Sequence, residues 1–184
     1  MKIFNLIGIA LILFSSPVNY LDKYEKKINK ELKKTFNIEG ISIKEYELPD
    51  HSDFGPDNSF YLIKNKDEHI GYVNINRVNA CRQGGCERPS LVSVQRYDHF
   101  YYMAVFDTEF STLKISILDY QSEHGYEICS RSWLKQFTGN SKTKYIYNKN
   151  IDAISGATVS VNALIDEINF MNGQLVQIFD EKNQ

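Results

Sequence analysis

The segment Phe100–Asp107 constrains the fold more than any other part of the sequence. Almost every residue in it is aromatic or apolar, which is typical of a central strand buried on both faces. Three further segments, Phe60–Lys64, Ile70–Val78 and Thr112–Tyr120, are strand-like, and the last two alternate apolar with polar side chains. This pattern predicts a central sheet that is rich in antiparallel pairs.

One amphipathic helix is expected before the strand segments in the sequence, and a second one after them. Residues 21–38 carry apolar residues three or four apart, with lysines and glutamates between them. From Val161 onward the same helical spacing continues to Ile178. A chain of 184 residues suits one domain with a substantial core. We therefore predict a single α+β domain whose sheet is flanked by an N-terminal and a C-terminal amphipathic helix.

Shorter elements are predicted from local signals. Gly40 is expected to close the first helix. Short strands are expected at Ile41–Leu48 and at Lys142–Tyr147. Ser130 or Ser132 is placed to cap a short helix that contains Trp133.

The N-terminus has the composition of an export signal. Lys2 precedes a nearly unbroken apolar run at residues 3–14, which is shorter than the roughly 20 residues of a spanning helix. The alternative is a buried N-terminal helix or strand. We predict that residues 1–18 are a signal peptide or an N-terminal membrane anchor, that residues 19–184 form the domain, and that it works outside the cytoplasm. The formal net charge of -2 would not attract the negatively charged backbone of a nucleic acid, so we expect no nucleic-acid partner.

The stretch at residues 152–160 combines turn and helix-start chemistry. Gly156 permits unusual backbone dihedrals, and the small side chain of Ala157 does not crowd the neighbouring Thr158. The first turn of a helix that starts near Thr158 would present unpaired N–H groups, which favour a phosphate. Ser155 and Ser160 add hydroxyl groups on either side. Taken alone, an ordinary helix cap is the commoner explanation of such residues.

The pattern of Asp152, Ser155, Gly156, Ala157 and Thr158 resembles the D-x-x-S-G-A-T motif of FMN-binding domains. This is the family of the C subunit of the sodium-pumping NADH:quinone oxidoreductase and of the G subunit of the Rnf complex. The resemblance extends over roughly residues 60–175. It implies that Thr158 carries FMN through a phosphoester, and that a flavin transferase moves FMN from FAD onto Thr158 outside the cytoplasm.

The same resemblance suggests contacts to the flavin ring. Many family members have a Glu-Thr-Pro-Gly-type turn where this chain has Glu123, His124 and Gly125. These side chains either face the ring or belong to an ordinary turn at a strand end. Trp133 either stacks on the ring or packs in the core. Arg131 either stabilises the reduced flavin or is a solvated surface charge.

Two cysteines enclose a Gly-Gly turn. Cys81 and Cys86 are expected to form a local disulfide in an exported protein. Free thiols and a metal site are the alternatives, and only His99 and Cys129 could complete a metal site. We expect no metal and a buried Cys129.

These features predict an electron-transfer module rather than a stand-alone enzyme. Redox partner proteins or a membrane electron-transfer complex would exchange electrons with its flavin. One alternative is a flavin-dependent reductase of a small extracytoplasmic acceptor. The other is an exported interaction module without a cofactor.

Overall fold

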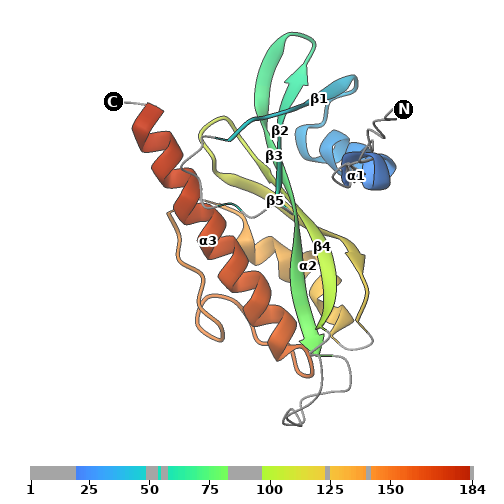
Figure 1. The fold of residues 1–184 in the computed structure, drawn as a ribbon, viewed down its shortest axis with the longest axis vertical. Helices are drawn as coiled ribbons and strands as arrows, with labels where there is room; N and C mark the ends of the chain where they lie inside the picture. The colour runs from blue at the N-terminus through green and yellow to red at the C-terminus, as the bar shows by residue number, and fades with distance from the viewer. Residues whose placement is uncertain are drawn as a thin grey trace, which may run out of the picture.

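The fold is built on one antiparallel sheet in which every strand pairs with the next strand along the chain. The computed structural model describes residues 20–48, 54, 58–82, 97–122, 125–139 and 142–182. The sheet has the order β1-β2-β3-β4-β5 (Figure 1). The strands are β1 (Ile41–Glu45), β2 (Ser59–Asn65), β3 (Glu68–Arg82), β4 (Tyr97–Phe106) and β5 (Thr112–Tyr120).

Strand β4 has the position that its composition predicts. It pairs with β3 on one side and with β5 on the other. Every residue from Phe100 to Phe106 is buried. Because side chains alternate across a strand, β4 supplies both faces of the sheet with apolar groups.

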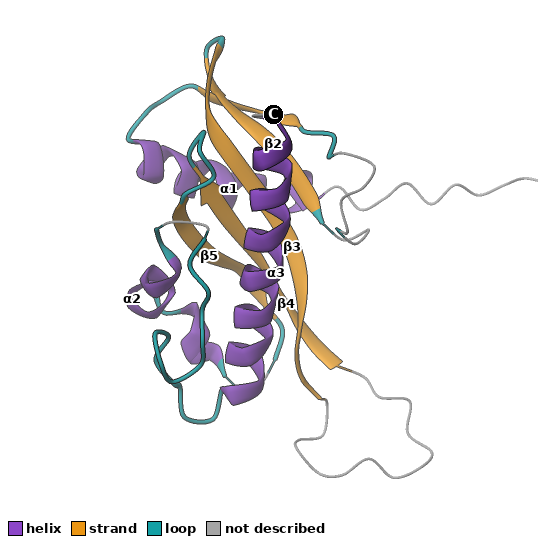
Figure 2. Cartoon of the chain, turned by 90° about the vertical axis from the view of Figure 1, so that its left-hand side faces the viewer, coloured by secondary structure: helices purple, strands orange, loops and turns teal. Residues whose placement is uncertain are grey.

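Two long helices cover the two faces of the sheet. Helix α3 (Thr158–Lys182) packs on the face that carries Tyr102, Ala104 and Phe106. Helix α1 (Tyr20–Phe36) packs on the face that carries Met103 and Val105. Figure 1 shows the helices on opposite sides of the sheet, and in Figure 2 α3 runs along one face. The predicted α+β domain with two flanking helices is confirmed.

A chain of short helical turns follows β5. It consists of η1 (Tyr126–Cys129), α2 (Arg131–Leu134) and η2 (Lys135–Phe137). Ser130, one of the two serines predicted to cap the short helix, lies at the N-cap position of α2, but its side chain makes no capping hydrogen bond. Backbone bonds in both directions join Thr112 and Gly139, at 2.7 and 2.9 Å. This segment therefore forms one isolated bridge with the first residue of the edge strand β5.

Some local predictions are wrong. The first helix ends at Phe36, and Asn37 takes the left-handed conformation (φ 55°) directly after it, so Gly40 does not close the helix. No strand forms at Lys142–Tyr147; only Tyr147 makes an isolated bridge, to Ile151. The backbone of this loop is fixed by side chains instead, since Asn169 bonds both the N–H and the C=O of Tyr145.

Two predictions fall outside the described part of the chain. The predicted signal or anchor at residues 1–18 precedes the first described residue. The proposed Cys81–Cys86 disulfide involves Cys86, which is not described, and the side chain of Cys81, which is not described either. Among the described helices, none is long and apolar enough to cross a membrane.

Candidate functional site

The turn before α3 presents Thr158 at the molecular surface. Gly156 has a left-handed backbone (φ 79°) and begins the approach to the helix. Val161 N donates to Ala157 O at 2.9 Å, which is the first bond of the helical ladder. Ala157 therefore lies at the N-cap position, where its side chain cannot accept a bond. Thr158 is the first helical residue and is exposed, so the helix-cap interpretation of its hydroxyl does not apply.

The start of this turn is held by the segment that follows β5. Trp133 Nε1 donates to the carbonyl of Asp152 at 2.9 Å. The N–H of Asp152 donates to Gln136 Oε1, also at 2.9 Å. Both backbone groups of Asp152 are thus fixed from one side, while its own side chain is exposed.

Trp133 occupies the core. It is 7% exposed, and its ring lies edge-on to Phe137 with the ring centroids 5.2 Å apart. Its polar N–H is satisfied by Asp152. The structure therefore places Trp133 beneath the turn, where it positions the backbone, and does not present its ring at the surface.

Gly125 packs against the other end of the turn. Its backbone is left-handed (φ 82°), and a Cβ atom there would lie 2.8 Å from Tyr120 Oη and 3.2 Å from Ala157 Cβ. Only glycine fits this position without displacing a neighbour. Gly125 and Ala157 were both predicted site residues, and the fold brings them into contact. Glu123 and His124, which precede Gly125, lie outside the described residues.

Tyr120 connects the surrounding elements. Its Oη lies 3.0 Å from Ser160 Oγ, and Ser160 is fully buried. The hydroxyl of Ser160 therefore points inward to β5, whereas Ser155 and Thr158 are exposed. Tyr120 could not be identified from the sequence. It lies at the end of a strand, and nothing in the sequence shows that its hydroxyl contacts Ser160, which lies in a helix forty residues later.

Tyr126 is a second residue that the sequence did not reveal. Its ring is 69% exposed, although it is a large aromatic residue. It lies edge-on to Tyr120, with the ring centroids 6.0 Å apart. An exposed aromatic ring thus lies one residue after Gly125, close to the turn that bears Thr158.

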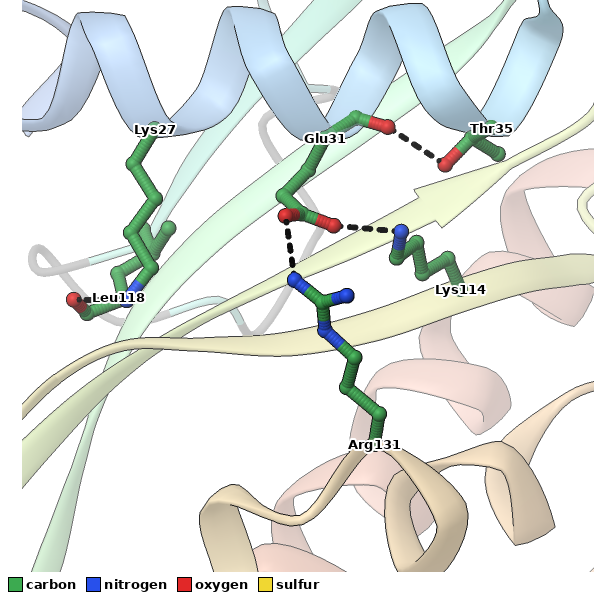
Figure 3. Close-up of polar contacts among 6 residues, drawn as sticks. All are labelled: Lys27, Glu31, Thr35, Lys114, Leu118 and Arg131. Atoms are coloured by element: carbon green, nitrogen blue, oxygen red, sulfur yellow. Dashed lines mark hydrogen bonds and ion pairs between the residues drawn. The ribbon is translucent and has the colours of Figure 1, made fainter.

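A pocket of about 410 Å³ opens on the other side of Tyr120. Its walls come from α1, from β5 and from the segment around η1 and α2. Figure 3 shows the polar groups at this place: Lys27 and Glu31 project from α1 toward β5 and α2. Lys27 Nζ donates to Leu118 O at 2.8 Å.

Glu31 is a buried carboxylate that lies between two cations. It is 5% exposed, and its oxygens lie 2.5 Å from Lys114 Nζ and 3.5 Å from Arg131 Nη2 (Figure 3). Burial alone raises the pKa of Glu31, but the hydrogen bond and charge of Lys114 and the charge of Arg131 outweigh it, so the pKa lies below its usual value. Glu31 is therefore ionised at neutral pH.

A second polar cluster lies under α3. Glu167 Oε1 accepts bonds from Asn76 Nδ2 at 2.6 Å and from Tyr102 Oη at 3.3 Å. Burial raises the pKa of Glu167 above its usual value. These bonds fix the rotation of α3 on the sheet, and so the position of Thr158 at its N-terminal end. Within the described residues, no group of three or more potential ligands could hold a metal ion.

The comparison with known families agrees with this geometry. Residues 97–171 match the sequence model of a family described as the FMN-binding domain. The matched segment begins with β4, includes Tyr120, Gly125 and the Thr158 turn, and ends within α3. A comparison with curated proteins gives no match to the chain. The part of the chain that builds most of this site is therefore similar in sequence to an FMN-binding domain.

Proposed function

We propose that this protein is an exported electron-transfer flavoprotein in which FMN is attached to Thr158 by a phosphoester. One observation carries the proposal. Thr158 is an exposed residue that directly follows a turn whose backbone is fixed at Asp152 by Trp133 and Gln136. An enzyme that attaches a cofactor needs access to the acceptor hydroxyl, and a carrier needs that hydroxyl in a defined position.

The start of α3 suits a phosphate diester. The N–H groups of its first turn have no acceptor within the helix, and the helix dipole adds partial positive charge there. The first turn of α3 contains no acidic residue that would repel a phosphate. A Cβ at Gly156 would meet nothing within 4 Å, so the space beside the turn is open. When bound, FMN supplies the one- and two-electron chemistry, and these residues hold its phosphate end.

Export and partners follow from other features of the sequence. The apolar run at residues 3–14 supports secretion or anchoring outside the cytoplasm. A covalent tether suits that location, because FMN lost there could not be replaced from the cytoplasm. Maturation would then require a flavin transferase. Redox partner proteins or a membrane electron-transfer complex would deliver and accept the electrons.

Intact-mass analysis after co-expression with a flavin transferase tests the attachment. The wild-type protein should gain the mass of one FMN minus one water. Thr158→Val should abolish the gain, whereas Ser155→Ala, which removes an exposed hydroxyl of the same turn, should retain it. Thr158→Ser tests whether any hydroxyl at this position suffices. An unmodified wild-type chain, or a Thr158→Val chain that still gains FMN, would overturn the proposal.

A flavin-dependent reductase of a small acceptor is the second candidate, and the pocket beside Tyr120 is the observation that favours it. A reductase would keep this pocket open to the acceptor after the flavin is bound. Oxidation of the reduced, loaded protein should then saturate with acceptor concentration. A carrier should instead show a rate that rises linearly with a small acceptor and saturates only with a partner protein.

A further inference from the structure

A groove of about 630 Å³ lies along the C-terminal half of α3, away from the Thr158 turn. Its walls come from α3 and from the loop that contains Lys142 and Lys144, which runs beside α3 in Figures 1 and 2. The first α3 residue in the wall is Asn169, eleven residues after Thr158. Eleven residues span roughly 16 Å along a helix axis, so the groove is separate from the candidate attachment site.

Asn172 is a buried amide in the wall of this groove. It is 3% exposed and lines the groove. Neither its Nδ2 nor its Oδ1 has a hydrogen-bond partner in the described part of the chain. A buried amide costs free energy unless another group bonds to it. Asn172 therefore points to a ligand that supplies both a carbonyl and an N–H.

Asn169, one turn earlier on α3, shows what an asparagine in this place can bind. Its Oδ1 accepts a bond from the N–H of Tyr145, and its Nδ2 donates to the C=O of the same residue, both at 2.8 Å. The amide thus pairs with both backbone groups of one residue. Asn172 lies three positions further along the helix, so it neighbours Asn169 on the same face. A peptide group of another chain would fit Asn172 in the same way.

The residues around Asn172 leave room for a second backbone. Gly173 is exposed, and a Cβ atom there would meet nothing within 4 Å. Glycine within a helix is less favourable than alanine, but here it lets another chain approach the helix closely. Phe170 is 41% exposed and lies edge-on to Phe54, with the ring centroids 5.9 Å apart. Phe170 and the half-buried Val176 offer apolar contacts to a bound side chain.

The charges of the groove favour a negatively charged ligand. None of the described residues that line it is acidic. Lys142 and Lys144 are both exposed on its rim. The unpaired amide, the glycine and the lysines together suit a polypeptide segment with an acidic side chain.

We propose that this groove binds an extended, acidic segment of a partner polypeptide. Asn172 pairs with the N–H and C=O of one residue of the segment, whose backbone passes over Gly173, and Lys144 pairs with its acidic side chain. The family match ends at residue 171, so these α3 positions lie beyond it. A partner docked here leaves the Thr158 turn uncovered, and the inference does not depend on what Thr158 carries.

Pools of short peptides test the groove directly. The probes are hexapeptides of alanine, valine and leucine, blocked at both ends, that contain two glutamates, two lysines or two glutamines. They are titrated into the full chain, and the side-chain amide signal of Asn172 in an NMR spectrum reports the contact. The acidic pool should shift this signal and bind about tenfold more tightly than the basic pool. No shift at Asn172, or equally tight binding of a single blocked glutamate, would overturn the proposal.

Two variants of α3 separate docking from folding. Asn172→Leu removes an amide that has no partner within the fold, so it should raise the urea midpoint while weakening the acidic pool about tenfold. Gly173→Ala should also favour the helix, but its methyl group obstructs the groove and weakens binding. Asn162→Ala, at an amide of α3 that bonds Thr158 O outside the groove, should bind as the wild type does. A lower urea midpoint for Asn172→Leu, or unchanged binding, would overturn the role of this amide.

A matched pair of charge reversals tests the rim. Lys144→Glu and Lys149→Glu make the same change in one loop, but of the two only Lys144 lines the groove. Lys144→Glu should weaken the acidic pool about tenfold and strengthen the basic pool, whereas Lys149→Glu should have little effect. Equal losses in both would refute the contact with Lys144. All these titrations use the chain without flavin, so a failure of attachment at Thr158 and a failure of the groove are read separately.

Discussion

Helices α1 and α3 cover opposite faces of one sheet, yet they are held by different forces. Helix α3 buries a continuous apolar face against the sheet; its fully buried residues include Val161, Leu164, Ile168 and Met171. Among the residues of α1 from Leu21 to Phe36, only Ile28 and Leu32 are fully buried. Leu21, Tyr24 and Phe36 pack on the same cluster but are only partly buried. Polar contacts add to these and reach β5 and α2 through Tyr24, Lys27 and Glu31.

The difference between the helices corresponds to their positions around the site. Helix α3 begins at the candidate attachment residue, and apolar burial, which is insensitive to pH and salt, keeps that residue in place. Helix α1 only closes a pocket next to the site. Part of the hold on α1 comes from partly exposed ion pairs such as Lys23 with Asp119, which are weak and are screened by salt, so α1 should respond to salt more than α3 does.

The largest expected effect comes from shortening a buried leucine in each helix. Leu164→Ala in α3 should destabilise the protein by about 2–5 kcal/mol, because it removes apolar contacts and leaves a cavity. Leu32→Ala makes the same change at an equally buried site of α1, but the apolar cluster that contains Leu32 is the smaller of the two, so we expect the lower end of that range. Urea unfolding measures both. A larger loss for Leu32→Ala would contradict the comparison.

A substitution at Gly125 tests how firmly the N-terminal end of α3 is fixed. Gly125→Ala introduces a Cβ close to Tyr120 and Ala157 and also strains a left-handed backbone, which costs about 1–2 kcal/mol. Gly40→Ala, after α1, has a similar φ of 76° but meets nothing within 4 Å. Gly125→Ala should therefore unfold at lower urea concentration than Gly40→Ala and should acquire FMN more slowly. Equal behaviour of the two would mean that the close contact does not matter.

Removing the buried charge of α1 should give a smaller loss. Glu31→Gln weakens the contacts to Lys114 and Arg131, at a cost of about 1–3 kcal/mol at neutral pH. Since the pKa of Glu31 is below the usual value of 4.5 in the folded state, its contribution is present above about pH 4.5 and is lost as the pH falls through the folded pKa. The stabilities of wild type and variant should thus converge in acid. Glu25→Gln, at an exposed position of α1, is the control and should have little effect.

Glu167 under α3 should show the opposite dependence with the smallest effect. Its pKa is raised above 4.5 in the folded state, so the folded protein binds this proton more tightly than the unfolded chain. Its favourable contribution is complete below about pH 4.5 and is lost as the pH rises through the folded pKa. Glu167→Gln keeps the acceptor for Asn76 and Tyr102 without the charge. It should leave stability at pH 7 within about 1 kcal/mol of wild type or above it, and a marked loss there would show that the charge itself is required.

The parts of the fold that depend on local patterns could be predicted from the sequence. The composition of Phe100–Phe106 indicates a strand buried on both faces, and the spacing after Val161 indicates a core-facing helix. Local signals at helix ends were less decisive, since the left-handed residue that directly follows the first helix is Asn37 and not Gly40. Glycine is favoured there but is not required.

The contacts that build the site could not be predicted, because they join residues far apart in the sequence. Trp133 and Asp152 are 19 residues apart, and Glu31 and Arg131 are 100 apart. The indole N–H of a buried tryptophan needs an acceptor, but the sequence does not show which carbonyl provides it. The family motif identified the Thr158 turn, whereas Tyr120 and Tyr126 became visible only in three dimensions.

The segment from Gly125 to Gly139 has a consequence for local unfolding. It bridges the start of the edge strand β5 through Thr112 and Gly139, and it also holds Asp152 through Trp133 and Gln136. An opening motion that frees the edge must release the turn as well, so both should behave as one cooperative unit in hydrogen exchange. The amides of Thr112, Gly139 and Asp152 should therefore exchange with a common opening free energy. Such an opening would also uncover the start of an edge strand, which is a template for pairing with another chain.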